Sequence, residues 1–238
     1  MTLMITLIGT GHIFNINEQV SFIIKHLWPD AVLVELDPSR YSAMTDPAAE
    51  RDDLPRSYKK AAEYQKRMAS ERGTTSGSEL IAAANTGRML GSDVLFIDTN
   101  AAETLERVMR EMPFGERMRY KFSSFRDRFS KKVSVEETIE EFSEDEESVM
   151  ESMRKRFPTL VRIIMDERNE HMASKISEAS GRYANIVAVI GDGHVEGISK
   201  LLGGKEIKKI RLKELMNKER MDEIRSELWT HRSEKDEG

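Results

Sequence analysis

The chain has 238 residues, of which 39% are hydrophobic and 33% charged; its net charge is −5 and it contains no cysteine. This composition is typical of a globular domain, excludes disulfides and thiolate chemistry, and argues against a dedicated nucleic-acid binder, which would carry a basic surplus. The first residues lack the basic start of a signal peptide, and no stretch approaches the roughly 20 apolar residues of a membrane span. We therefore expect a cytoplasmic protein without a membrane segment.

The first element is a wholly apolar run over residues 3–8, which is typical of a strand buried on both faces of a parallel sheet. It leads into a G-x-G-H turn that ends at His12. Asn15 and Glu18 then have the spacing of a capping box for the next helix. A second buried strand over residues 31–37 follows, so the order strand, helix, strand predicts a right-handed parallel crossover.

The next segment, residues 38–75, is polar, and a thin apolar pattern predicts a helix over residues 57–72. Ser76 and Glu79 look like the two members of another capping box, which would open a helix over residues 80–90. A third strand, residues 93–98, again ends in a carboxylate. Asn100 with Glu103 is expected to cap the helix that follows it.

Residues 114–158 differ in character, because a basic segment is followed by an acidic one. We interpret this region as a helical insertion. Since charge runs usually mark exposed faces, a solvated helical hairpin is favoured over a binding device.

The strongest amphipathic pattern predicts a helix over residues 159–180. Arg168 falls near the middle of its apolar arc, where a buried charge needs a partner. A fourth apolar strand, residues 186–190, leads into a second G-x-G-H turn with His194. A fifth strand over residues 207–212 and a helix over residues 213–228 follow.

These elements predict an α/β fold with a mostly parallel central sheet flanked by helices, and with a strand–GxGH–helix unit near each end of the chain. We expect a single domain over residues 1–238, with residues 114–158 as an insertion and residues 213–238 as a C-terminal helix and flexible tail. The last helix could pair between subunits of a homo-oligomer.

In an open α/β sheet, ligands bind beyond the carboxyl ends of the strands. The candidate residues at these ends are His12, Glu35 or Asp37, Asp98 and His194. Two imidazoles with one or two carboxylates suit Zn, Mn, Fe, Co or Ni and leave a position for water. A metal-bound water is acidic enough to attack a carbonyl near neutral pH.

Structural explanations compete with this interpretation. The histidine of a single G-x-G-H turn is more often a capping or packing residue than a ligand. Two such turns, each between an apolar strand and a helix, make a metal-binding role about as well supported as a structural one. Glu79 is explained by its place in a capping box, and Arg168 could bridge to Glu35 or Glu79 across the core. A nucleotide site is weakly supported because neither turn continues as G-x-G-x-x-G or G-K-[ST].

The chain resembles the TraB/PrgY family, which is grouped more widely with the Tiki and GumN proteins. The resemblance covers residues 3 to about 202 and is weakest over residues 114–158. It rests on residues 9–12 (G-T-G-H), 34–37 (V-E-L-D) with Arg40 and Tyr41, 77–79 (G-S-E), 167–169 (E-R-N) with Met172 and Ala173, and 191–198 (G-D-G-H-V-E-G-I).

The Tiki branch implies a metal-dependent peptidase that cleaves peptide or amide bonds. Carried over, it points to His12 and His194 as ligands of a divalent metal such as Mn, Co or Zn, and to Glu35 or Glu79 as a further ligand or general base. Arg168 would clamp a substrate carboxylate or an oxyanion.

The matching motifs also supply candidate substrate-binding residues, namely Arg40, Glu167, Asn169, Gly9 and Gly191. The TraB/PrgY branch is associated with shutting down peptide pheromone signals, by cleavage or by sequestration. The alternative is therefore a non-catalytic protein that binds a peptide in the same cleft.

Overall fold

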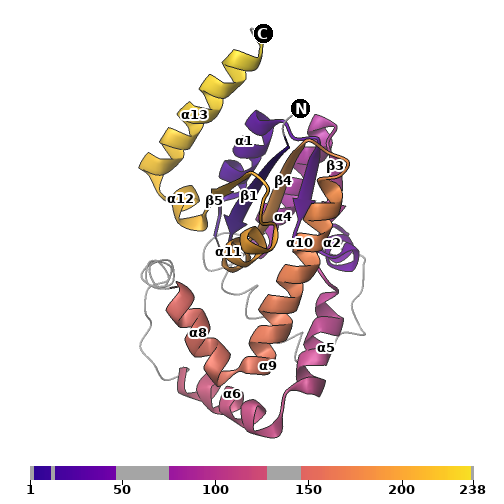
Figure 1. Ribbon diagram of the computed structural model, residues 1–238, viewed down its shortest axis with the longest axis vertical. Coiled ribbons are helices and arrows are strands. Elements are labelled where there is room, and N and C mark those ends of the chain that lie inside the picture. The colour runs from indigo at the N-terminus through magenta and orange to yellow at the C-terminus, as the bar shows by residue number, and fades with distance from the viewer. Residues whose placement is uncertain (1–2, 12–13, 47–74, 128–145, 237–238) are drawn as a thin grey trace.

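The computed structural model describes residues 3–11, 14–46, 75–127 and 146–236 of the chain. Its centre is a five-stranded, all-parallel sheet with the strand order β3-β2-β4-β1-β5 (Figure 1). The α/β fold that the sequence predicts is confirmed. The strands are β1 Met4–Thr10, β2 Ala31–Val34, β3 Asp93–Phe96, β4 Asn185–Gly191 and β5 Ile207–Ile210.

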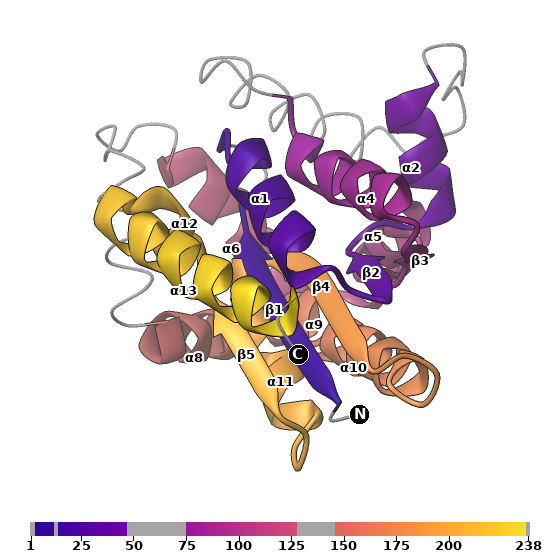
Figure 2. The ribbon, with the colours of Figure 1, turned by 90° about the horizontal axis from the view of Figure 1, so that it is seen from above.

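Helices cover both faces of the sheet (Figure 2). Helices α1, α4 and α13 lie on one face, and α10 and α11 lie on the other. The helices are α1 Asn17–Leu27, α2 Pro38–Thr45, α4 Ser78–Leu90, α5 Ala101–Glu111, α6 Phe114–Asp127, α8 Glu146–Arg156, α9 Pro158–Val161, α10 Glu167–Ala179, α11 Asp192–Leu201, α12 Leu212–Met216 and α13 Lys218–Asp236, with a π-helix, η1, at Arg162–Asp166.

The core consists of two apolar layers, because successive strand residues point to opposite faces. In β2, for example, Val32 and Val34 pack with α1 and α4, whereas Leu33 packs with α10 and α11. All three side chains are completely buried. This double burial explains why the strands are continuous apolar runs that the sequence pattern reveals.

The two strands that lead into the G-x-G-H turns lie side by side at the centre of the sheet. β1 pairs with β4 in parallel, and Thr10 stands opposite Gly191 at their carboxyl ends. The next helices, α1 and α11, lie on opposite faces of the sheet. This is the arrangement at which open α/β sheets bind ligands.

Two of the predicted capping boxes are wrong. Helix α1 has Ile16 at its N-cap, without a side-chain cap. Helix α4 begins after Gly77, whose φ of 77° is in the left-handed region. The side chain of Ser78 instead donates to Asn17 Oδ1 at 3.1 Å, so a contact between α4 and α1 replaces local capping. The third prediction is confirmed, since Asn100 accepts hydrogen bonds from the backbone of Ala102 and Glu103.

Two predicted helices are interrupted. The helix predicted over residues 159–180 contains the π-helix η1, where the Glu167 N–H bonds to the carbonyl of Arg162, five residues earlier. The C-terminal helix is divided at Asn217, which is extended and whose side chain accepts from Arg220 N, so that it caps α13. The helix predicted over residues 57–72 lies outside the described residues.

Within the region predicted as an insertion, the described parts are helical. Helices α6 and α8 lie with α5 and α9 below the sheet in Figure 1. A small apolar cluster holds this part together through Val108, Met112 and Ile163. Among the residues that the structure describes, no helix has the length and apolarity needed to cross a bilayer.

The close packing of α4 on the sheet generates a stability prediction. A Cβ at Gly87, inside α4, would lie 2.8 Å from Val32 Cγ2 and 3.2 Å from Val94 Cγ2. We expect Gly87→Ala to lower the free energy of unfolding by about 1–3 kcal/mol, although alanine has the better helix propensity. The control is Gly115→Ala in α6, where a Cβ meets nothing within 4 Å. Urea unfolding should show this control unchanged or slightly stabilised; equal effects of the two variants would contradict the packing argument.

Candidate functional site

A single guanidinium, that of Arg168 in the first turn of α10, contacts side chains that follow three different strands. It donates from Nε to Asp98 Oδ1 and from Nη2 to Asp98 Oδ2, both at 2.9 Å, and Nη2 also bonds to Glu35. Nη1 lies 3.2 Å from His194 Nε2 and 3.3 Å from the carbonyl oxygen of Ile164. We call Glu35, Asp98, Arg168, Asn169 and His194 the Arg168 network.

The Arg168 network is buried and charged. The Arg168 side chain is 15% exposed, whereas the side chains of Glu35 and Asp98 are 3% and 2% exposed. Burial acts to lower the pKa of Arg168, but the charges and hydrogen bonds of Glu35 and Asp98 outweigh it and raise the pKa above its ordinary value. Arg168 is therefore a permanent cation, and removing it would take from two buried carboxylates the cation that they share, at a cost of about 3–5 kcal/mol.

Glu35, directly after β2, links two of the predicted site residues. One carboxylate oxygen, Oε2, accepts the backbone N–H of Gly191, which begins the second G-x-G-H turn. The other, Oε1, lies 3.5 Å from His194 Nε2. The sequence left the choice between Glu35 and Asp37 open. The structure places Asp37 at the N-cap of α2, where it accepts from the backbone of Ser39 and Arg40.

The imidazole of His194 contacts Asn169 through Nδ1 and faces Arg168 and Glu35 with Nε2. Its Nδ1 lies 2.7 Å from Asn169 Oδ1, which can only accept, so Nδ1 carries the proton. Its Nε2 lies 3.2 Å from Arg168 Nη1, which can only donate, and 3.5 Å from the carboxylate oxygen Oε1 of Glu35. Gly197 permits this arrangement, because a Cβ there would lie 2.3 Å from Asn169 Nδ2.

The first turn of α10 separates two predicted residues that are adjacent in sequence. Glu167 lies on the outer side, where its carboxylate pairs with Arg107 at 2.8 Å and with Arg162. Arg168 points inward. Arg40, another predicted residue, approaches the network from α2, with Nη1 3.4 Å from Asp98 Oδ2.

The two glycines predicted to bind substrate, Gly9 and Gly191, make close contacts within the fold. Gly9 leaves room for Asp192, since a Cβ on Gly9 would lie 2.0 Å from Asp192 Oδ1. Asp192 in turn accepts from Arg211 Nε at 3.0 Å, from Arg211 Nη2 at 2.9 Å and from the Leu212 backbone at 2.8 Å. These hydrogen bonds join the second G-x-G-H turn to the end of β5. The N–H of Gly191 is taken by Glu35.

Two further candidates are Glu79 and His12. Glu79 lies in the first turn of α4, and its side chain is completely buried. His12 lies outside the described residues, although β1, which leads to it, is the direct neighbour of β4. Their roles stay predictions.

The described donors fit part of a metal site. His194 Nε2 and Glu35 Oε1 are 3.5 Å apart, which suits two ligands of one tetrahedral ion bonded at about 2.0–2.2 Å. The Nδ1–H of His194 on an amide oxygen is the outer contact that metal-binding imidazoles usually make. Among residues 3–11, 14–46, 75–127 and 146–236, however, no group of three His, Asp or Glu side chains could hold a metal ion. His12, the other histidine predicted as a ligand, lies outside the described residues.

Comparisons with known proteins identify the family of the chain. The model of the TraB/PrgY/gumN family matches residues 2–213. The chain is also similar to the uncharacterized protein MJ1365 of Methanocaldococcus jannaschii, with 28% identity over 210 residues that cover 83% of this chain and 53% of that relative. The chain thus spans about half the length of this relative. Because the family model matches most of the chain, we conclude that the chain belongs to the TraB/PrgY/gumN family.

Proposed function

We propose that the chain is a metal-dependent hydrolase that cleaves peptide or amide bonds at the Arg168 network. The observation that supports this most is the approach of His194 Nε2 to the buried carboxylate of Glu35, whose Oε1 lies 3.5 Å away. Both side chains follow strands that end at the centre of a parallel sheet, where α/β proteins bind their ligands.

The proposed ligands of a divalent ion such as Mn, Co or Zn are His194, Glu35 and His12. When bound, such an ion supplies an acidified water and polarises a carbonyl group. The chain contributes the tautomer of His194, which Asn169 fixes through Nδ1 before any ion arrives. An imidazole nitrogen has one lone pair, so Arg168 Nη1 would have to leave Nε2 for that nitrogen to serve as a ligand.

Arg168 then has donors available for the substrate. Its Nε and Nη2 remain held by Asp98, while Nη1 can turn toward the oxyanion that develops as the peptide carbonyl becomes tetrahedral. The proton of the attacking water would pass to a carboxylate oxygen of Glu35 or Glu79. Arg40 pairs with Asp98 and adds a second guanidinium beside that of Arg168. We infer that Arg40, which is partly exposed, binds a carboxylate of the substrate.

One observation favours the alternative, a peptide-binding protein without catalysis. In the structure both candidate donors already have partners, since His194 faces Arg168 and Glu35 bonds to Arg168 and Gly191. An arrangement closed in this way could serve as the rigid floor of a binding cleft.

Hydrolysis of a mixed peptide library separates the two functions. We expect the chain loaded with Mn, Co or Zn to cleave peptides, detected by mass spectrometry, and Glu35→Gln to lose at least about 100-fold in rate because the carboxylate is needed as ligand or base. Glu103→Gln, on the exposed first turn of α5, is the matched control and should keep full activity. Peptides bound but uncleaved under all three metals would establish the binding alternative.

Arg168→Lys tests the double role assigned to the guanidinium. Lysine keeps the charge but cannot bond to Asp98 and Glu35 through a planar fork. We expect kcat to fall by about 10-fold or more while metal affinity, measured by calorimetry, stays equal or rises, because the competing Nη1 group is gone. Arg225→Lys on the exposed face of α13 is the control. A parallel loss of metal affinity and kcat would show that Arg168 only supports the ligands.

A further inference from the structure

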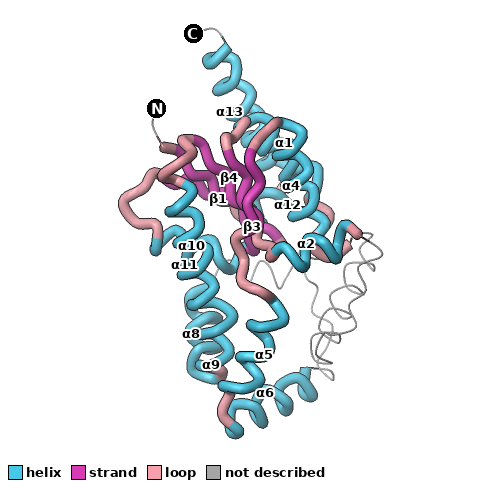
Figure 3. Tube along the Cα trace, turned by 90° about the vertical axis from the view of Figure 1, so that its right-hand side faces the viewer, coloured by secondary structure: helices cyan, strands magenta, loops and turns pink. Residues whose placement is uncertain are grey.

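The strand β3 forms one border of the sheet, and β2 is its neighbour on the other side. It lies at the right of the sheet in Figure 1 and toward the viewer in Figure 3. The N–H groups of Asp93 and Ile97 bond inward, to the carbonyls of Asp30 at 3.0 Å and Val34 at 3.1 Å. Because these groups alternate in direction along a strand, those of Val94 and Phe96 point outward.

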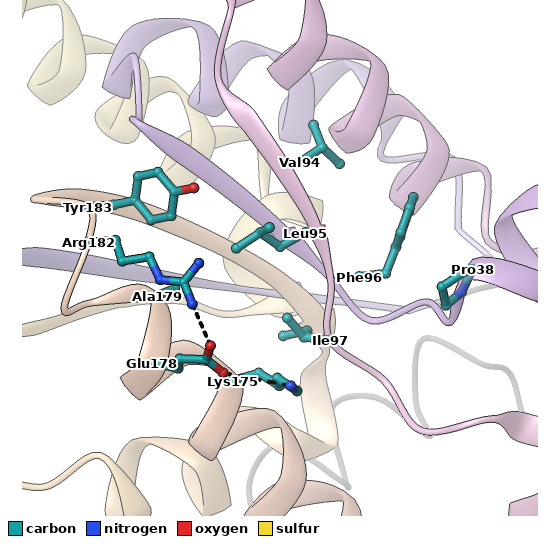
Figure 4. Close-up of a pocket in the computed structure, with 10 residues that line it drawn as sticks. All are labelled: Pro38, Val94, Leu95, Phe96, Ile97, Lys175, Glu178, Ala179, Arg182 and Tyr183. Atoms are coloured by element: carbon teal, nitrogen blue, oxygen red, sulfur yellow. Dashed lines mark hydrogen bonds and ion pairs between the residues drawn. The ribbon is translucent and has the colours of Figure 1, made fainter.

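A groove with a volume of about 340 Å³ follows this border (Figure 4). Four consecutive residues line it, from Val94 to Ile97. Side chains of consecutive strand residues alternate between the two faces, so a single groove reaches all four only if it runs along the strand edge. We call it the β3 groove. Its other lining residues are Pro38, Lys175, Glu178, Ala179, Arg182 and Tyr183.

The β3 groove has an apolar floor and a charged rim. Leu95, Ile97 and Ala179 belong to the apolar layer under the sheet. On the rim, Glu178 pairs with Arg182 at 2.6 Å and with Lys175 at 3.7 Å, which leaves a surplus of one positive charge. Such a surface accepts apolar side chains and disfavours a ligand rich in lysine or arginine.

One end of the β3 groove meets the Arg168 network. Ile97, which lines the groove, is followed by Asp98, which Arg168 holds through two hydrogen bonds. Pro38, at the same end, follows the N-cap residue Asp37. A chain that lay in the groove and continued in the direction of β3 would therefore arrive at the network.

We propose that the β3 groove binds the substrate as an extended peptide, which pairs with β3 as an added strand. The outward N–H and C=O groups of Val94 and Phe96 bond to the peptide backbone, and alternate side chains of the peptide contact the apolar floor. This rests on the proposed function and names its substrate class, an unfolded peptide segment with apolar side chains. A small amide or the surface of a folded protein has no unpaired extended backbone that could pair with the outer edge of β3.

The test is amide exchange measured by NMR on the full chain, with the metal removed by a chelator so that no cleavage occurs. The probe is the peptide Ac-Ser-Val-Thr-Val-Thr-Val-Ser-NH2. At saturation we expect exchange at Val94 and Phe96 to slow at least about 10-fold, while exchange at Leu95, on the inward side of the strand, changes less than about twofold. Unchanged exchange at Val94 and Phe96 with bound peptide would overturn the proposal.

Two comparisons use backbone chemistry alone. A peptide with N-methyl groups on alternate amides cannot pair with a strand, and it should bind at least about 10-fold more weakly by fluorescence anisotropy. Val94→Pro removes an outward N–H and should weaken binding similarly, whereas Val94→Thr keeps the N–H and should bind like the wild type. Equal binding of both peptides would overturn the proposal without any variant being needed.

Failure of this inference is distinguishable from failure of the proposed function. Protection of Val94 and Phe96 by the peptide, with no cleavage under any metal, leaves the groove in place and removes the hydrolase. Cleavage of the N-methylated and plain peptides at equal rates keeps the hydrolase and removes the groove. Protection of these two amides in the free protein, in step with its dimerisation, assigns the border to a second copy of the chain and also overturns the proposal.

Discussion

The structure depends on one buried cation. Arg168 enters the apolar side of α10 and would be costly there without partners, and Glu35 and Asp98 supply them from the ends of β2 and β3. The same guanidinium faces His194 after β4. One side chain thus ties a helix to three strand ends. It also sets the charge and the geometry in which any chemistry at this edge must take place.

The sheet could be predicted from sequence because its strands are buried on both faces. Continuous apolar runs such as residues 31–34 have few alternatives in a chain of this composition. The first residues of the helices were harder to predict than the strands, because a tertiary contact can replace a local side-chain cap. Ser78 bonds to Asn17 on α1 and so does not open a capping box. The π-helix before α10 likewise leaves no mark in the apolar pattern, since it changes only which carbonyl each N–H reaches.

The candidate site was predictable where strand ends carry the chemistry. Glu35 and His194 follow buried strands, and the structure brings them together. The sequence also indicated that Arg168 faces inward, because it falls near the middle of the apolar arc of its helix, and the structure shows it bonded to Asp98 and Glu35. The hydrogen bonds between Arg211 and Asp192 were not predicted from the sequence. Asp192 follows β4 and Arg211 follows β5, and β1 lies between these two strands, so the contact depends on the tertiary fold and leaves no local sequence pattern.

The most direct test of the account is a crystal structure of the chain grown with Zn²⁺, with anomalous scattering used to locate the ion. The account predicts one strong peak bound by His194 Nε2 and Glu35, with His12 as a further ligand and Arg168 Nη1 no longer on the imidazole. Zn²⁺ absent from this position at saturating concentration, with Arg168 still bonded to both Glu35 and His194, would contradict it. The Arg168 network would then be the polar support of a binding cleft.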